Sequence, residues 1–251
     1  MRIGILKADG VNPKLQPDFG EYPAMITRVL NAAATFYAND TPEFLVYDVE
    51  LGEYPERIND CDGYIITGSK SSVYDDVPWV HQLLEFVRAL DASRTPTVGI
   101  CFGHQLLAHA LGGKAEPAAV GWRVGVHHAQ VTSIASFMAP NAGDFALLYS
   151  HKDQVASLPA GAVVLATSDA CPNAMFQIGE HMLGLQGHPE FIKDYSRGLL
   201  ALRRDTLGES LYTSGMNSLQ ENTDEVMVGA WMLRFLADAR AASHDLAVEE
   251  S

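Results

Sequence analysis

One cysteine in this sequence lies between two glycines at a spacing that could support nucleophilic chemistry. The run Gly99-Ile100-Cys101-Phe102-Gly103 follows a short apolar stretch, residues 96–100, and precedes a segment with one apolar face that extends to Leu111. This is the Gly-x-nucleophile-x-Gly pattern of a sharp strand-to-helix turn, with sulfur in place of a serine hydroxyl. Small flanking residues leave room for the strained backbone of such a turn. The alternative interpretation is an ordinary buried cysteine in a glycine-rich turn.

The chemistry expected of such a cysteine follows from its place in the turn. The turn lifts the thiol clear of the sheet and places it at a helix N-terminus, where the positive end of the helix dipole favours a thiolate. A thiolate nucleophile needs a base, and the base needs a group that orients it. The sequence therefore has to supply a histidine and a polar partner near Cys101.

A histidine and a glutamate two residues apart follow the apolar stretch that ends at Gln186. In Gly187-His188-Pro189-Glu190, the proline biases His188 towards an extended backbone, in which side chains two apart point the same way. A carboxylate beside one ring nitrogen would fix the tautomer and leave the other nitrogen for the thiol. The alternative is a plain strand-to-helix turn with Glu190 in the first turn of the helix.

The two motifs together resemble the class I (triad) glutamine amidotransferases, over roughly residues 65–191. The resemblance implies that Cys101 forms a glutamyl thioester, that His188 is the base and that Glu190 orients it. It implies an α/β fold, a three-layer sandwich with a mostly parallel central sheet of the flavodoxin-like type. Cysteine-elbow relatives of the protease-like and chaperone-like kinds lack the His-Pro-Glu segment.

The resemblance also assigns an oxyanion hole, the set of N–H groups that bind a developing negative charge. It implies donors from the loop at Gly68 and Ser69 and from Phe102, the residue after the nucleophile. Two fixed N–H donors of this kind contribute several kcal/mol to transition-state stabilisation. As a plain turn, the same loop would lead into a helix capped by Asp75 or Asp76, and we expect this cap on either interpretation.

The glutamine pocket is assigned by resemblance as well. Gln105 matches a family glutamine that contacts substrate, and residues 121–125 match a segment near the pocket. A further loop resembles the Ser-His-Gly-Asp loop of the family and supplies Ser150, His151, Lys152 and Asp153. Lys152 replaces the loop glycine, and many members have Gly-Gly-Pro where this chain has Gly68-Ser69-Lys70, so the fit of free glutamine is open. These variants look most like stand-alone members, including γ-glutamyl peptidases.

Composition narrows the classes of function. The chain has 251 residues, of which 47% are hydrophobic, and 17 Lys and Arg against 31 Asp and Glu give a net charge of −14. This acidity argues against nucleic acid as a partner. No apolar run approaches the length of a membrane span, and the N-terminus lacks a signal-peptide pattern, so we expect no association with a membrane. Three scattered cysteines fit a reducing cytoplasm.

We expect no cofactor and no metal, since His104 and His109 are too far apart around a helix to bind the same metal ion.

Apolar periodicity predicts strands that alternate with helices, and hence a parallel sheet, through the first half of the chain. We expect a single domain over residues 1–251, with a C-terminal helical extension from about residue 195 to residue 251. The polar stretch 205–224 reads as a loop or flap. The predicted strands are 2–6, 44–49, 63–67, 96–100, 122–129, 145–149, 162–166, 174–178 and 181–186, the later ones partly antiparallel. The predicted helices are 21–37, 77–90, 103–111, 195–204 and 225–240.

These observations predict an enzyme that hydrolyses the γ-amide of glutamine or of a γ-glutamyl compound, releasing glutamate and ammonia or an amine. Its partner would be this small-molecule substrate. Because nothing in the chain resembles a synthetase domain, one alternative is a glutaminase subunit that delivers ammonia to a separate synthetase. Another is a non-catalytic binding or regulatory protein of the same fold. For a longer substrate, Lys152 could pair with a carboxylate, or it could point into solvent.

Overall fold

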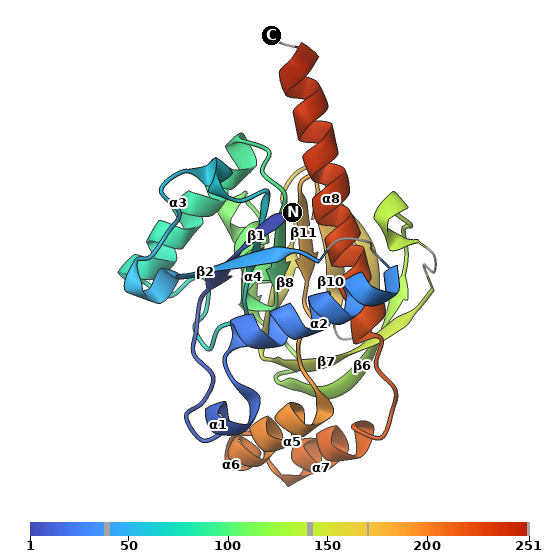
Figure 1. The fold of residues 1–251 in the computed structure, drawn as a ribbon. Coiled ribbons are helices and arrows are strands. Elements are labelled where there is room, and N and C mark those ends of the chain that lie inside the picture. Colours follow the sequence, from blue (N-terminus) through green and yellow to red (C-terminus); the bar gives the residue numbers. More distant parts are fainter. Residues whose placement is uncertain (38–40, 140–142, 170, 250–251) are drawn as a thin grey trace.

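The computed structural model describes residues 1–37, 41–139, 143–169 and 171–249 (Figure 1). The strands are β1 (Arg2–Lys7), β2 (Glu43–Asp48), β3 (Gly63–Ile66), β4 (Thr97–Ile100), β5 (Lys114–Pro117), β6 (Arg123–Val131), β7 (Phe145–His151), β8 (Asp153–Ser157), β9 (Ala162–Ser168), β10 (Cys171–Ile178) and β11 (Met182–Leu185). The helices are α1 (Gln16–Phe19), α2 (Tyr22–Tyr37), α3 (Pro78–Ala92), α4 (Phe102–Ala110), α5 (Lys193–Leu202), α6 (Arg204–Leu207), α7 (Glu209–Ser218) and α8 (Glu225–Glu249). In these ranges, no helix combines the length and apolar character needed to cross a membrane.

Within the described chain, nine strands form one sheet in the order β2-β1-β3-β4-β11-β10-β9-β6-β7. In this order, neighbouring strands are parallel from β2 across to β11, and neighbouring strands are antiparallel from β11 across to β7. A second sheet, β5 with β8, was not expected from the sequence, because its strands are short and carry little apolar alternation. The predicted α/β sandwich is confirmed, with a parallel half and an antiparallel half.

The period-2 alternation of the parallel strands divides the core between the two faces of the sheet. In β1, Ile3 and Ile5 belong to the core cluster under α2 and α8, whereas Leu6 belongs to the cluster under α3 and α4. In β3, Ile65 faces the first cluster and Ile66 the second. Figure 1 shows α2 crossing the lower part of α8, with which it is in contact, and α8 continuing past the rest of the fold.

The polar stretch 205–224 is not a loop or flap, and this prediction was wrong. It contains α7 and all of α6 except its first residue, and these two helices form a helical group with α5 at one end of the sheet (Figure 1). Leu211, Tyr212 and Met216 lie at helical spacing on α7, and together with Leu207 of α6 they pack on a third core cluster that includes Val124 of β6. The few apolar positions are enough to hold α7 because β6 supplies the surface that they cover.

Candidate active site

The expected turn at Cys101 is present and its backbone is strained. Cys101 has φ of 53° and ψ of −99°, a conformation that side-chain-bearing residues rarely adopt. It sits between β4 and α4, where its N–H donates to the carbonyl of Leu185 at 2.8 Å and its carbonyl accepts from the N–H of Gln105 at 3.0 Å. These bonds to β11 and α4 hold the strained residue in place, and the side chain is 6% exposed.

The two flanking glycines are required by close packing. A Cβ on Gly99 would lie 2.4 Å from the carbonyl carbon of Gly103, and a Cβ on Gly103 would lie 2.5 Å from the carbonyl oxygen of Ile66. Both contacts are with backbone, which cannot move aside as a flexible side chain can. The glycines therefore let the strand, the turn and the helix approach one another closely enough to form the elbow.

His188 and Glu190 form the predicted pair. Nδ1 of His188 lies 2.8 Å from Oε1 of Glu190, and both side chains are buried. The His188 N–H donates to the carbonyl of Leu148 at 2.8 Å, which ties the segment after β11 to β7. Glu190 precedes α5, which begins at Lys193, so it does not belong to the first turn of that helix.

The ring of Phe191 stacks on the His188 imidazole, with centroids 3.9 Å apart and planes 9° from parallel. The sequence reasoning missed Phe191, although it directly follows the motif. Gly68 approaches both catalytic candidates closely. A Cβ on Gly68 would lie 3.1 Å from Cε1 of His188 and 3.7 Å from Cβ of Cys101. Gly68 thus lies next to both His188 and Cys101, and its lack of a side chain leaves the space between them open.

The charges around His188 favour its protonated form. Burial on its own lowers the pKa of His188, but the charges of Glu190 and Cys101 outweigh burial and raise this pKa to about 10. In the described part of the chain, Nε2 is buried without a hydrogen-bond partner. The imidazolium therefore has its Nδ1–H committed to Glu190, and its Nε2–H is left for the chemistry at Cys101.

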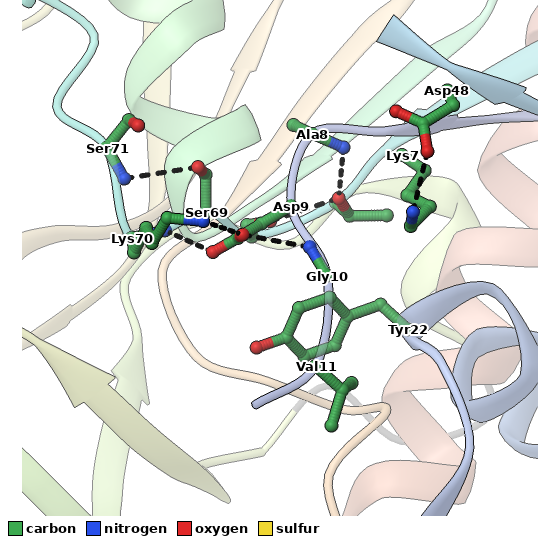
Figure 2. A network of polar contacts seen from close by, with 12 residues as sticks. Lys7, Ala8, Asp9, Gly10, Val11, Tyr22, Asp48, Ser69, Lys70 and Ser71 are labelled. Atoms are coloured by element: carbon green, nitrogen blue, oxygen red, sulfur yellow. Dashed lines mark hydrogen bonds and ion pairs between the residues drawn. The ribbon is translucent and has the colours of Figure 1, made fainter. Parts of the chain in front are cut away.

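Polar contacts anchor the loop that carries Gly68 and Ser69 (Figure 2). The carboxylate of Asp9, a buried residue after β1, accepts from the Lys70 N–H at 2.8 Å and from Lys70 Nζ at 2.5 Å. Thr67 Oγ1 accepts from the N–H of Ala8 at 2.9 Å. Asp9 was not identified from the sequence, because its partner is distant along the chain.

Phe102, the other predicted oxyanion donor, is the first residue of α4. The first N–H groups of a helix have no partner within the helix and point outward from its end. The Phe102 side chain is buried and packs on the ring of Trp79, with centroids 5.6 Å apart. This packing orients the start of α4 beside Cys101.

The expected cap of α3 is absent. The residue before its first turn is Val77, which makes no side-chain cap, and Pro78 occupies the first turn. The Asp75 carboxylate instead accepts from the Ser72 N–H at 2.8 Å, and Asp76 pairs with His81. Proline at this position needs no hydrogen bond for its missing N–H, which lowers the demand for a cap.

A cavity of about 150 Å³ adjoins Cys101 and gathers most of the residues that the sequence assigned to the pocket. Gly68, Phe102, His188 and Glu190 are not among the residues that line it. The lining residues are Ser69, Lys70, Ser71, Cys101, Gln105, Trp122, Ser150, His151, Lys152, Asp153 and Arg203. Arg203 was missed by the sequence reasoning and carried no local signal.

Several of these pocket residues are already bonded within the protein. The Gln105 amide donates to the Asp153 carbonyl at 2.7 Å and to Gln186 Oε1 at 3.2 Å, so its own oxygen is the atom available to a ligand. The Asp153 carboxylate accepts from the hydroxyls of Ser72 and Tyr74, at 2.5 and 3.0 Å. Asp153 therefore braces the loop that follows Ser69.

His151 is neutral in this environment. Burial lowers the pKa of His151 to about 3. Its Nδ1 lies 2.8 Å from the carbonyl oxygen of Asp153, which can only accept, so Nδ1 carries the proton. Nε2 is then an acceptor, and it has no partner in the ranges that the structure describes. Those ranges also contain no group of His, Cys, Asp and Glu that could hold a metal ion.

Comparisons with known proteins identify a family and similar folds. The family described as glutamine amidotransferase class-I matches residues 27–200. Gamma-glutamyl peptidase 3 of Arabidopsis thaliana is 30% identical over 172 residues, 65% of this chain and 69% of the relative. A GMP synthase [glutamine-hydrolyzing] of Bifidobacterium longum is 28% identical over 236 residues, 90% of this chain and 41% of the relative. A solved glutamine amidotransferase from Thermotoga maritima has a TM-score of 0.68 at 19% identity and covers 95% of this chain and 97% of its own.

Proposed function

Because the chain belongs to the class-I glutamine amidotransferase family, we propose that it hydrolyses the γ-amide bond of glutamine or of a γ-glutamyl compound through a thioester on Cys101. The observation that carries this proposal is the meeting of a strained cysteine with the His188–Glu190 pair beside Gly68. A strained elbow costs about 1–3 kcal/mol and is maintained where function requires it.

The first half of the reaction forms the thioester. The Cys101 thiolate attacks the side-chain carbonyl carbon of the γ-glutamyl group, and the carbonyl oxygen takes up the negative charge. The N–H groups of Phe102 and of the loop at Gly68 and Ser69 stabilise this oxyanion. His188 then gives its Nε2 proton to the departing nitrogen, so the C–N bond breaks and ammonia or an amine leaves.

The second half returns the enzyme to its starting state. Neutral His188 accepts a proton from water, whose oxygen attacks the thioester carbon. The C–S bond breaks, glutamate is released, and Cys101 regains its thiolate beside a protonated His188. Glu190 keeps the same hydrogen bond to Nδ1 throughout, and its charge stabilises the imidazolium at both ends of the cycle.

A γ-glutamyl peptide is the substrate that we favour over free glutamine. The similarity to a gamma-glutamyl peptidase supports this choice. So does Lys152, an exposed residue that adds a positive charge to the lining of the cavity. Gln105, Ser150, His151 and Asp153 line the same cavity and are proposed to bind the glutamyl group.

The second candidate is a glutaminase subunit that passes ammonia to a separate synthetase. It is favoured by the similarity to a GMP synthase, of which this chain spans 41%. Under this proposal the hydrolytic chemistry at Cys101 is the same, and the difference lies in the acceptor of the ammonia.

Glutamate release from the purified protein tests both candidates. We expect a higher kcat/KM for a γ-glutamyl dipeptide than for glutamine, and no release from the Cys101→Ala variant. Replacement of Lys152 by glycine should lower kcat/KM for the dipeptide more than for glutamine. Activity only after a synthetase is added would favour the second candidate. If the protein releases no glutamate from either substrate, with or without a synthetase, the non-catalytic binding or regulatory function is the interpretation that remains.

A further inference from the structure

An arginine from the C-terminal helices lines the cavity next to Cys101. Arg203 lies at the junction of α5 and α6, and its side chain reaches the wall that Ser150 and Trp122 also form. The chain as a whole is acidic, with a net charge of −14, whereas the lining of this cavity includes the cationic residues Lys70, Lys152 and Arg203. Arg203 therefore adds a positive charge to the wall of the cavity.

Two uncharged groups hold Arg203 in position. Nη1 donates to the Ser150 hydroxyl at 2.5 Å, and Cζ lies 4.9 Å from the ring centroid of Trp122. Stacking on an aromatic ring and a hydrogen bond to a hydroxyl both orient a guanidinium without neutralising its charge. Arg203 is thus pre-positioned in the cavity wall.

Its positive charge has no acidic partner. Across the described residues, Arg203 forms no ion pair with a carboxylate, whereas nearby Lys70 pairs with Asp9 and adjacent Arg204 pairs with Glu209. A guanidinium has five N–H donors in a planar fork, and the bond to Ser150 uses one of the donors on Nη1. The remaining donors match the two oxygens of a carboxylate.

We propose that Arg203 binds a carboxylate of the substrate in this pocket, and so contributes to the selection of γ-glutamyl compounds by charge. This inference rests on the proposed function. A γ-glutamyl peptide offers two such groups, the α-carboxylate of the glutamyl part and a carboxylate on the departing amine. Both present the same chemistry to the guanidinium, and substrates that lack one or the other distinguish them.

The test compares Arg203→Met with wild type on three compounds. γ-Glutamylglycine has both carboxylates, γ-glutamylethylamide has only the α-carboxylate, and 4-aminobutanoylglycine has only the distal one. Loss of a hydrogen-bonded charge contact lowers kcat/KM by roughly 10- to 100-fold. We expect this loss of kcat/KM for γ-glutamylglycine. We also expect it for the single-carboxylate compound that keeps the carboxylate bound by Arg203, and little change for the other single-carboxylate compound.

Arg204, the residue next to Arg203, provides a matched control. Arg204 also stacks on an aromatic ring, with Cζ 4.6 Å from the Tyr212 centroid, but it pairs with Glu209 and does not line the cavity. Arg204→Met should leave kcat/KM unchanged for all three compounds. A loss in Arg203→Met that is the same for all three compounds, or no loss for any, would overturn the proposal.

A binding measurement separates this inference from the proposed function. In the Cys101→Ala background, calorimetry gives the Kd of glutamate and of γ-glutamylglycine without turnover. Adding Arg203→Met should raise at least one of these Kd values by roughly 10-fold or more. If wild type releases no glutamate yet the Arg203 variant binds more weakly, the proposed function fails and the carboxylate site stands. Equal Kd values with and without Arg203 would contradict the site itself.

Discussion

Nδ1 of His188 lies 2.8 Å from Oε1 of Glu190, in surroundings that bury both side chains. A buried carboxylate without a partner would be costly, and so would a buried imidazolium, but each neutralises the other here. The pair therefore decides which nitrogen of the ring faces the reaction. The contribution of the His188–Glu190 pair to catalysis and its contribution to protein stability can be measured separately.

The first prediction concerns the identity of the nucleophile. A glutamine-like electrophile should label Cys101 and spare Cys61 and Cys171. Burial raises the pKa of the Cys61 thiol, and it raises that of Cys171 to about 12, so neither forms a thiolate near neutral pH. Peptide mapping by mass spectrometry gives the result. Labelling that persists in Cys101→Ala would show that another residue reacts.

The roles of the histidine and the glutamate lead to different losses of activity. His188→Ala removes both the acid and the base, whereas Glu190→Gln keeps an amide that can still hold the ring. We expect kcat to fall about 10²-fold further in His188→Ala than in Glu190→Gln. Single-turnover glutamate release measures both variants. A larger loss in Glu190→Gln would mean that the assigned roles are wrong.

Protein stability should depend on pH through His188. The folded-state pKa of about 10 exceeds the ordinary value of 6.5, so the folded protein binds the proton more tightly than the unfolded chain does. This contribution to stability is complete below pH 6.5 and is lost as pH rises towards about 10. Urea unfolding across this range should show a steeper decline for wild type than for Glu190→Gln. Parallel declines would contradict the coupling.

The strain at the elbow should appear as a reversed order of stability. Glycine adopts the Cys101 backbone conformation more readily than alanine does, so Cys101→Gly should be more stable than Cys101→Ala by about 1 kcal/mol or more. The control is Ala237→Gly, at an exposed position in the interior of α8, where glycine should be destabilising by about 1 kcal/mol. Denaturant midpoints decide the order. Equal stability of the two Cys101 variants would argue against strain.

Asp9 should act as a positioning residue for the proposed oxyanion loop. Asp9→Asn weakens the charge-assisted contacts to Lys70, so we expect kcat to fall roughly 10-fold with a smaller change in KM. Asp48→Asn is the control, because Asp48 pairs with Lys7 at 2.6 Å in the same region but does not hold the loop (Figure 2). A drop in melting temperature without a change in kcat would reduce Asp9 to a structural role.

The sequence by itself determined the features that depend on neighbouring residues. The elbow at Cys101 and the pair His188–Glu190 are each contained in a few consecutive positions, so backbone geometry links residue type directly to placement. The alternation of strand-like and helical runs in the first half likewise predicted a parallel sheet, because a helix between two strands lets them run in the same direction. Resemblance extended this to the residues around the cavity.

Only the tertiary structure decided which distant residues complete the site. Arg203 meets Ser150 across 53 positions, and Lys70 meets Asp9 across 61, and neither pairing leaves a local pattern. The helices α6 and α7 form because β6 offers a surface for a few apolar side chains, which composition alone did not reveal. Contacts of this kind depend on the path of the whole chain, since burial and charge pairing are properties of the folded surroundings.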